Sequence, residues 1–394
     1  MTSVRPESGR RSYFDHAATT PLRPEALEAM LPYLADDFAN PSGAHAESRR
    51  ARMALDDARD RIAELLGVGP GDVVLTSGGT EADDLAVQGG WEAAWGAAAD
   101  GPGTVVCAAM EHHAVLEACR ALARGTGADL RLVPSDPDGR VDLGALADAC
   151  TPDVRLVSVM TVNNELGTVQ PLEDVARVTA ERSPAALLHT DAVQAVPWLD
   201  TADVTAPADL VSVSAHKFGG PKGSGAVVLR RGAAVRPRIG GGGQERGRRS
   251  GTPNVAGAVG MATALAATVA ERGSTVARVR ALRDRLADGL AGRLGGVTES
   301  GRREDRVAGI LHLRLDGIES EALVVLLDDA GIAASAGAAC SSGAVEPSHV
   351  LVSLGLGPVA ASSGVRFSLG VTSTEQDVDH ALDCVPPVVE RLRS

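Results

Sequence analysis

Residues 208–230, ADLVSVSAHKFGGPKGSGAVVLR, contain two apolar runs typical of buried strands, joined by a segment rich in glycine. Lys217 follows the first run directly and lies between a histidine and a phenylalanine. A lysine at the end of a buried strand is desolvated, which lowers its pKa and makes its amine a nucleophile toward aldehydes. This stretch therefore predicts a buried sheet and a Schiff-base lysine. Lys222 lies in the glycine turn, where a structural role is the simpler interpretation.

Five further apolar runs upstream have the same strand-like character: DVVLTSG, TVVCAAM, LRLVP, VRLVSVM and ALLHTD. Helical patterns separate most of them, and this alternation is typical of a mainly parallel sheet with helices on both faces. We therefore predict an α/β fold, with a large domain built on a mainly parallel seven-stranded sheet between helices. A smaller α+β domain follows a long helical pattern at about 254–290. The expected boundaries are an N-terminal segment, 1–20, that joins the small domain, a large domain, 21–265, and a small domain, 266–394.

Composition excludes several classes of protein. The net charge of −13 argues against a chain that mainly coats nucleic acid, because phosphate binding requires a basic surface. We expect a cytoplasmic protein that is not a membrane protein, since no stretch has the apolar length of a signal peptide core or a membrane span.

The five cysteines are odd in number and contain no C-x-x-C pair, so neither a disulfide framework nor a metal site is expected. Cys340 alone lies among small and polar residues, which is typical of a mobile, exposed loop.

Polar residues follow several of the predicted strands, at the edge where open parallel sheets bind ligands. Gly79 and Thr80 precede a helix and suit a phosphate, His112 provides a flat ring, and Asp191 ends a strand as a carboxylate that needs a cationic partner. With Lys217 these groups are the parts that pyridoxal phosphate requires. Each also has an ordinary interpretation as a capping turn, a surface turn or a loop residue.

Ten motifs in collinear order, from about residue 12 to about 375, carry a family resemblance. They are YFDHAATTP, NPSGAHAESRRAR, TSGGTEADDLA, MEHHAV, VNNELGTVQP, HTDAVQAV, HKFGGPKGSG, GGGGQERGRRSGTPN, SAGAACSSGAVEPSHVL and VRFSLG. Together they closely resemble the cysteine desulfurases of the class V aminotransferase group, which are fold-type I pyridoxal-phosphate enzymes. The segment AACSSGAVEPSHVL resembles the long-loop, iron–sulfur-assembly-like subgroup.

The resemblance implies a role for each matching position. Lys217 binds the cofactor covalently, Asp191 pairs with its pyridinium nitrogen, and His112 stacks on its ring and acts as acid or base. The remaining implied cofactor contacts are Gly79, Thr80, Gln194, Ser214, His216 and, donated to the partner subunit of a homodimer with shared active sites, Thr252. Asn164 and Arg366 are the implied substrate-carboxylate contacts, although a structural ion pair remains an alternative for the arginine.

The implied reaction converts L-cysteine to L-alanine, with the sulfur transferred to Cys340 as a persulfide and then to an acceptor protein. A selenocysteine lyase, or an aminotransferase, is the nearer alternative. A non-catalytic RNA-binding module that uses QERGRRSG is the remoter one. The chain departs from the family pattern at Gly337, Ala338 and Gln244 and in its short tail, and the tail puts docking to the usual cluster scaffold in doubt.

Overall fold

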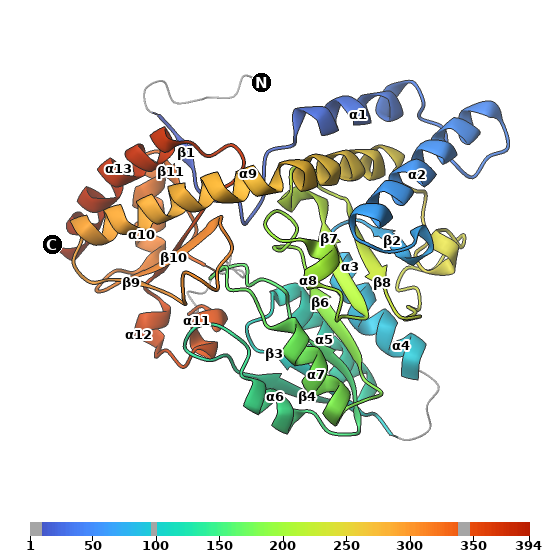
Figure 1. Ribbon diagram of the computed structural model, residues 1–394, viewed down its shortest axis with the longest axis horizontal. Coiled ribbons are helices and arrows are strands. Elements are labelled where there is room, and N and C mark those ends of the chain that lie inside the picture. Colours follow the sequence, from blue (N-terminus) through green and yellow to red (C-terminus); the bar gives the residue numbers. More distant parts are fainter. Residues whose placement is uncertain (1–9, 96–100, 338–346) are drawn as a thin grey trace.

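The computed structural model describes residues 10–95, 101–337 and 347–394. A seven-stranded sheet forms the centre of the large domain (Figure 1). Its strands, in spatial order, are β2 (Val73–Thr76), β8 (Gly225–Leu229), β7 (Leu210–Ser214), β6 (Leu187–Asp191), β5 (Val154–Ser158), β3 (Thr104–Ala108) and β4 (Asp129–Val133). Only β8 runs antiparallel to its neighbours in this sheet. The predicted fold class is confirmed, and all seven strand-like runs form strands.

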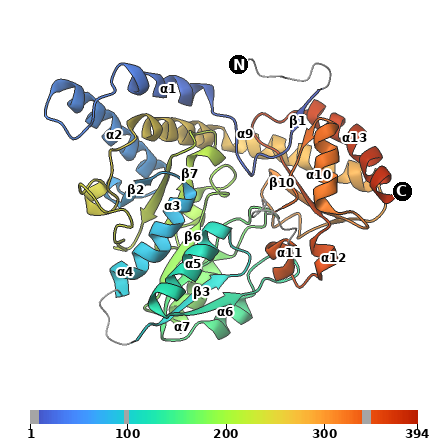
Figure 2. The same ribbon diagram turned by 180° about the vertical axis from the view of Figure 1, so that it is seen from behind.

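Helices cover both faces of this sheet, with α7 and α8 over one face and α3 and α5 over the other (Figures 1 and 2). The helices of the large domain are α1 (Pro24–Ala35), α2 (Ala46–Leu65), α3 (Gly79–Asp84), α4 (Gly90–Trp95), α5 (His113–Thr126), α6 (Leu143–Ala149), α7 (Leu172–Arg182) and α8 (Thr201–Val204). The core between the layers consists mainly of valine, alanine and leucine. Close packing of small aliphatic side chains therefore holds these layers together.

A single helix, α9 (Val255–Arg293), connects the two domains. Its first half packs on α1 and α2, and its second half packs on α13 (Glu375–Arg393) (Figure 1). The expected domain boundary at residue 265 therefore lies inside a continuous helix.

The small domain is built on a three-stranded antiparallel sheet in the order β12 (Gly364–Ser368), β10 (Ile310–Leu315), β9 (Val297–Glu299). Its other helices are α10 (Ser320–Asp329), α11 (His349–Ser353) and α12 (Pro358–Ala361). The N-terminal strand β1 (Ser12–Tyr13) pairs with β11 (Ile332–Ala333). Next to it, the ring of Phe14 packs edge-to-face on Phe367 in β12. This segment is thereby held against the small domain before the chain enters the large one.

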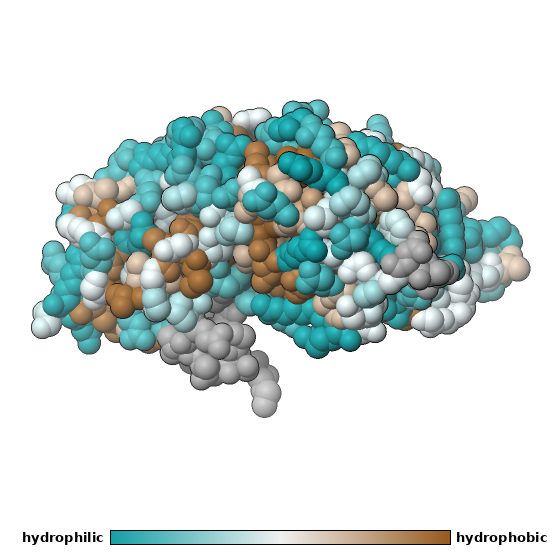
Figure 3. Space-filling view, turned by 90° about the horizontal axis from the view of Figure 1, so that it is seen from below, coloured by the Kyte–Doolittle hydropathy of each residue, from teal (hydrophilic) through white to brown (hydrophobic). Residues whose placement is uncertain are grey.

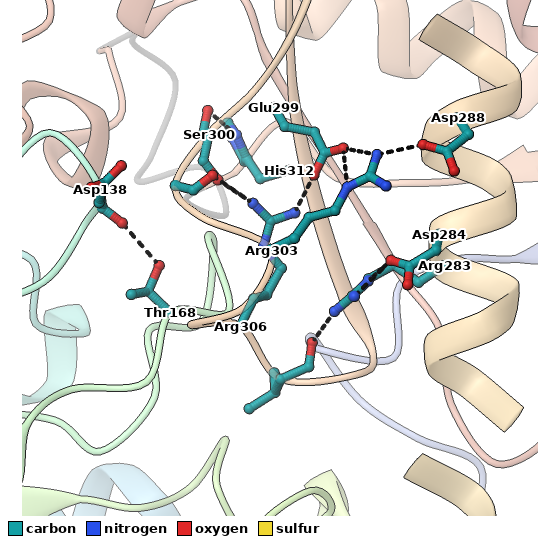
Figure 4. A network of polar contacts seen from close by, with 12 residues as sticks. Asp138, Thr168, Arg283, Asp284, Asp288, Glu299, Ser300, Arg303, Arg306 and His312 are labelled. Carbon is teal, nitrogen blue, oxygen red and sulfur yellow. Dashed lines mark hydrogen bonds and ion pairs between the residues drawn. The ribbon is translucent and has the colours of Figure 1, made fainter. Parts of the chain in front are cut away.

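A network of polar contacts around Arg306 lies in the small domain, near the contact between Thr168 and Asp138 of the large domain (Figure 4). Arg306 is buried, and its Nη1 donates to Glu299 Oε2 at 3.1 Å. The backbone on either side of Arg306 bonds to the large domain, with Val169 N donating to Asp305 O at 2.8 Å and Val307 N to Gly167 O at 3.0 Å. This pairing fixes the loop that follows β5 against the small domain.

The surface shows separate apolar patches among hydrophilic residues on the face drawn in Figure 3. In the part of the chain that the structure describes, no helix combines the length and the apolar character needed to cross a membrane.

Candidate active site

A cavity of about 310 Å³ lies at the carboxyl edge of the seven-stranded sheet, between the two domains. Ten of the residues singled out from the sequence line it: Gly79, Thr80, His112, Asn164, Asp191, Gln194, Ser214, His216, Lys217 and Arg366. Nine belong to the large domain, where parallel strands bring their carboxyl ends to one edge, and Arg366 comes from β12 of the small domain.

Lys217 ends a short 3₁₀ turn, Ala215–Lys217, directly after β7. Its Nζ donates hydrogen bonds to Ala17 O at 2.6 Å and to Ala18 O at 2.9 Å, so the N-terminal segment holds the ammonium at the cavity wall. Burial, and then the positive charge of Arg366, lower the pKa of Lys217 to about 8. A larger fraction of this lysine is therefore an uncharged amine near neutral pH than of an exposed lysine.

Asp191 is the last residue of β6, and its Oδ1 accepts the backbone N–H of Val193 at 2.8 Å. Burial raises the pKa of this carboxyl to about 6, while the Val193 N–H and the charge of Lys217 oppose that rise. A buried carboxylate with one backbone donor still has the capacity for a cationic partner. Gln194 lies beside it and donates from Nε2 to Ala17 O at 2.8 Å.

His112 caps the N-terminus of α5, and its Nδ1 accepts the backbone N–H of Ala114 at 3.1 Å. Burial, and then the charge of Lys217, lower the pKa of His112 to about 4, so the ring is neutral at physiological pH. Because Nδ1 is an acceptor, the proton of the neutral ring resides on Nε2. His112 is therefore positioned as a flat, neutral N–H donor.

The part of the cavity that is lined by Gly79, Ser214 and His216 is suited to an anion. The Ser214 hydroxyl is buried and has no hydrogen-bond partner among the described residues. A Cβ added at Gly79 would lie 3.3 Å from Ser214 Cβ, so glycine leaves the space in front of this hydroxyl open. His216 lines the same part, and burial lowers its pKa to about 4. The unpaired hydroxyl and the open backbone suit phosphate oxygens.

The small domain contributes the guanidinium of Arg366. Its Nη1 donates to Asn164 O and its Nη2 to Asp15 Oδ1, both at 2.8 Å. Arg366 Nε and Asn164 Oδ1 are buried, and neither has a partner in the residues described. The ion pair with Asp15 shows that the arginine has a structural contact as well as a place at the cavity.

Comparison with known proteins assigns this arrangement to a family. The family described as Aminotransferase class-V matches residues 12–381. The chain belongs to the class V aminotransferase family. The resemblance recognised in the sequence is thus confirmed.

Relatives within this family carry a more specific name. A cysteine desulfurase of Cereibacter sphaeroides is 43% identical over 98% of this chain and 97% of its own. An IscS-like cysteine desulfurase of Mycobacterium tuberculosis is 43% identical over 97% of each chain. Among solved structures, a NifS-like protein matches with a TM-score of 0.89 and 34% identity, covering 97% of this chain and 100% of that one.

Two residues assigned from the resemblance lie outside this cavity. Thr252 lines a neighbouring cavity together with Ser77 and Ser224, at the same edge of the sheet, where β2 ends and β8 begins. Cys340 lies outside the described residues. The proposed roles of both therefore stay predictions.

The fold also brings to the site several residues to which no role was assigned from the sequence. Asp83 from α3 and Glu165 are buried at the cavity, and Asp15 holds Arg366. His113 and His349 also line it, with ring centroids 4.5 Å apart. Their motifs were recognised, but only tertiary contacts show which of these side chains turn toward the cavity.

Proposed function

We infer that this chain is a pyridoxal-phosphate-dependent cysteine desulfurase, which converts L-cysteine to L-alanine and transfers the sulfur to a cysteine persulfide. One observation carries this proposal. A single cavity brings a lysine of lowered pKa, a strand-end carboxylate, a neutral histidine and an arginine together, in a chain whose full-length relatives are named cysteine desulfurases.

The donor set fits pyridoxal phosphate. Ser214, His216 and the backbone at Gly79 and Thr80 suit the phosphate, and the unpartnered Ser214 hydroxyl supports this placement. Asp191 suits a protonated pyridine nitrogen, because a buried carboxylate is stabilised by a cation. When bound, the cofactor supplies an aldehyde that reacts with amines and a protonated ring that accepts electrons from the substrate.

We propose that Arg366 and Asn164 bind the substrate carboxylate. Arg366 is fixed by Asp15 on one side, which orients the guanidinium before the substrate arrives. A substrate carboxylate would provide the acceptor that Arg366 Nε does not find among the described residues.

Lys217 and His112 are the proposed proton carriers. Lys217 as a free amine takes the proton from the substrate Cα, a role that its lowered pKa supports. His112 carries its proton on Nε2, and we propose that this N–H exchanges protons with the bound substrate.

The sulfur step is assigned to Cys340 from the family resemblance. Its thiolate attacks the substrate sulfur, so that an S–S bond forms while the C–S bond breaks and its electron pair passes to carbon. Protonation of that carbon yields alanine, and the persulfide carries the sulfur to an acceptor protein.

We also propose a homodimer in which Thr252 reaches the partner's cofactor phosphate. An exposed apolar stripe on α1 and the loop after it supports an interface in this part of the large domain; it consists of Leu27, Leu31, Leu34 and Phe38. The four described cysteines are free thiols, and this supports our proposal of a reducing compartment such as the cytoplasm.

The visible absorption spectrum of the purified protein, recorded before and after addition of L-cysteine, tests this function. We expect a cofactor band that changes on addition, with alanine and sulfide formed in the same sample. Lys217→Ala should remove both the band and the products, while Lys222→Ala, a lysine in the nearby turn, should retain them. A wild-type protein that binds the cofactor but forms no alanine would refute the proposed reaction.

A further inference from the structure

A row of buried polar side chains crosses the sheet beneath the active-site cavity. Ser212 on β7, His189 on β6, Ser158 on β5 and Glu111 after β3 are each 0% exposed, and Asp83 on α3 is 2% exposed. The reaction described above uses none of them. Buried groups of this kind are costly unless their protons and lone pairs are matched, so the position of each proton matters.

Hydrogen bonds connect the members of the row. The Ser158 hydroxyl lies 3.2 Å from Glu111 Oε1 and 2.9 Å from His189 Nδ1, and His189 Nε2 lies 3.0 Å from the Ser212 hydroxyl. Ser212 also faces the Asp83 carboxyl, and its hydroxyl lowers the pKa of Asp83, but by less than burial and the charge of Asp191 raise it. Burial, and then the charge of Asp191, raise the pKa of Glu111 as well.

The surroundings of Asp83 oppose a negative charge there. Its Oδ1 has no hydrogen-bond partner among the described residues and lies 3.7 Å from His189 Nε2, beyond hydrogen-bond range. The ionisable groups that face it are Asp191, Glu111, Cys119 and His189. Burial, and then the charge of Asp191, raise the pKa of Asp83 well above its usual value.

The imidazole in the middle of the row does not supply a compensating charge. Burial lowers the pKa of His189 to about 3, so this ring is neutral at physiological pH. Asp191, in contrast, accepts the Val193 N–H and faces Lys217. Of the two neighbouring aspartates, Asp191 is therefore the one with groups that stabilise a carboxylate.

We propose that Asp83 is a neutral carboxylic acid and that it acts as a positioning residue for Asp191. By holding a proton, Asp83 leaves Asp191 as the carboxylate that faces the cavity. An ionised Asp83 would instead place a second negative charge beside Asp191 and compete with it for the same proton or cation. The role in orienting Asp191 rests on the proposed function, whereas the proton on Asp83 does not.

Infrared difference spectroscopy of the full-length protein, with and without cofactor, locates the proton. The wild-type minus Asp83→Asn spectrum should contain the C=O stretch of a protonated carboxylic acid at neutral pH. Asp84→Asn, which changes the adjacent half-exposed aspartate, should not remove this band. A difference spectrum with only carboxylate stretches would overturn the proposal, as would a wild-type spectrum without any protonated carboxyl band if Asp83→Asn fails to fold.

Denaturant unfolding of the cofactor-free protein provides an independent measure of whether Asp83 is protonated in the folded state. Asp83 would release its proton on unfolding, so the unfolding constant of the wild type relative to Asp83→Asn should rise about tenfold per pH unit between pH 6 and 8. A ratio independent of pH would contradict the proposal. Neither this result nor the infrared spectrum depends on desulfurase activity, so the two proposals can fail separately.

In the cofactor-loaded protein, the visible absorption band can be followed as the pH is changed. The midpoint of that titration reports the charge beside Asp191. Asp83→Asn replaces one neutral group by another and should leave this midpoint unchanged, whereas Asp191→Asn should shift it. A shift of about one unit or more in Asp83→Asn would show that Asp83 is charged and would overturn the proposal.

Discussion

The lowered pKa of Lys217 predicts how fast the cofactor-free protein captures pyridoxal phosphate at different pH values. Attachment requires the uncharged amine of Lys217. With a pKa of about 8, about a tenth of the lysine is uncharged at pH 7 and about nine tenths at pH 9. The attachment rate should therefore rise about tenfold between pH 7 and 9 and level off above that.

The same contacts predict the effect of a substitution. Arg366 lowers the pKa of Lys217, and Asp15 raises it. Arg366→Gln removes the cation and leaves the Asp15 charge uncompensated, so it should raise the Lys217 pKa and slow attachment at pH 7. Arg302→Gln, at an exposed arginine of the same domain, should leave the rate unchanged.

Stopped-flow absorbance after mixing cofactor-free protein with pyridoxal phosphate from pH 6 to 10 measures these rates. The reaction of free Nα-acetyl-lysine with the cofactor serves as a control for the titration of the cofactor itself. A protein rate that still rises tenfold per unit above pH 9 would show an ordinary lysine and refute the reasoning from burial.

Three further predictions concern the support of the site. Arg366→Lys keeps the charge but cannot reach both Asn164 O and Asp15, so the KM for L-cysteine should rise about tenfold to a hundredfold in steady-state kinetics. Arg306→Gln breaks a buried ion pair and should lower the free energy of unfolding by about 3 kcal/mol, measured by denaturant titration. An unchanged value would show that this ion pair does not stabilise the loop of the small domain that bonds to the large one. Thr252→Ala should speed cofactor loss in a dialysis assay, and no change would argue against a shared phosphate site.

The sheet and most of the cavity could be predicted because they depend on local patterns. Apolar runs of strand length mark all seven strands, and the parallel arrangement brings the residues after them to one edge. Asp191 ends a strand and Lys217 and His112 lie within four residues of the end of one, so their positions in the chain already imply their place at that edge.

The rest depends on tertiary contacts that no local pattern contains. Asp83 lies one turn into a helix, and only the packing of α3 on β7 turns it toward Asp191 and His189. Asp15 reaches Arg366 because the N-terminal segment pairs with the small domain across more than 300 residues of chain. The expected boundary at residue 265 falls inside α9, because a helix that passes between domains has no break in its sequence pattern.

The mass of the intact protein after a single exposure to L-cysteine, with alanine counted in the same sample, tests the central claim most directly. We predict that the wild type gains the mass of one sulfur atom per subunit and forms one alanine for each sulfur. Cys340→Ser should retain the cofactor band but gain no sulfur and form little alanine. Alanine formation by Cys340→Ser at the wild-type rate would contradict the persulfide mechanism.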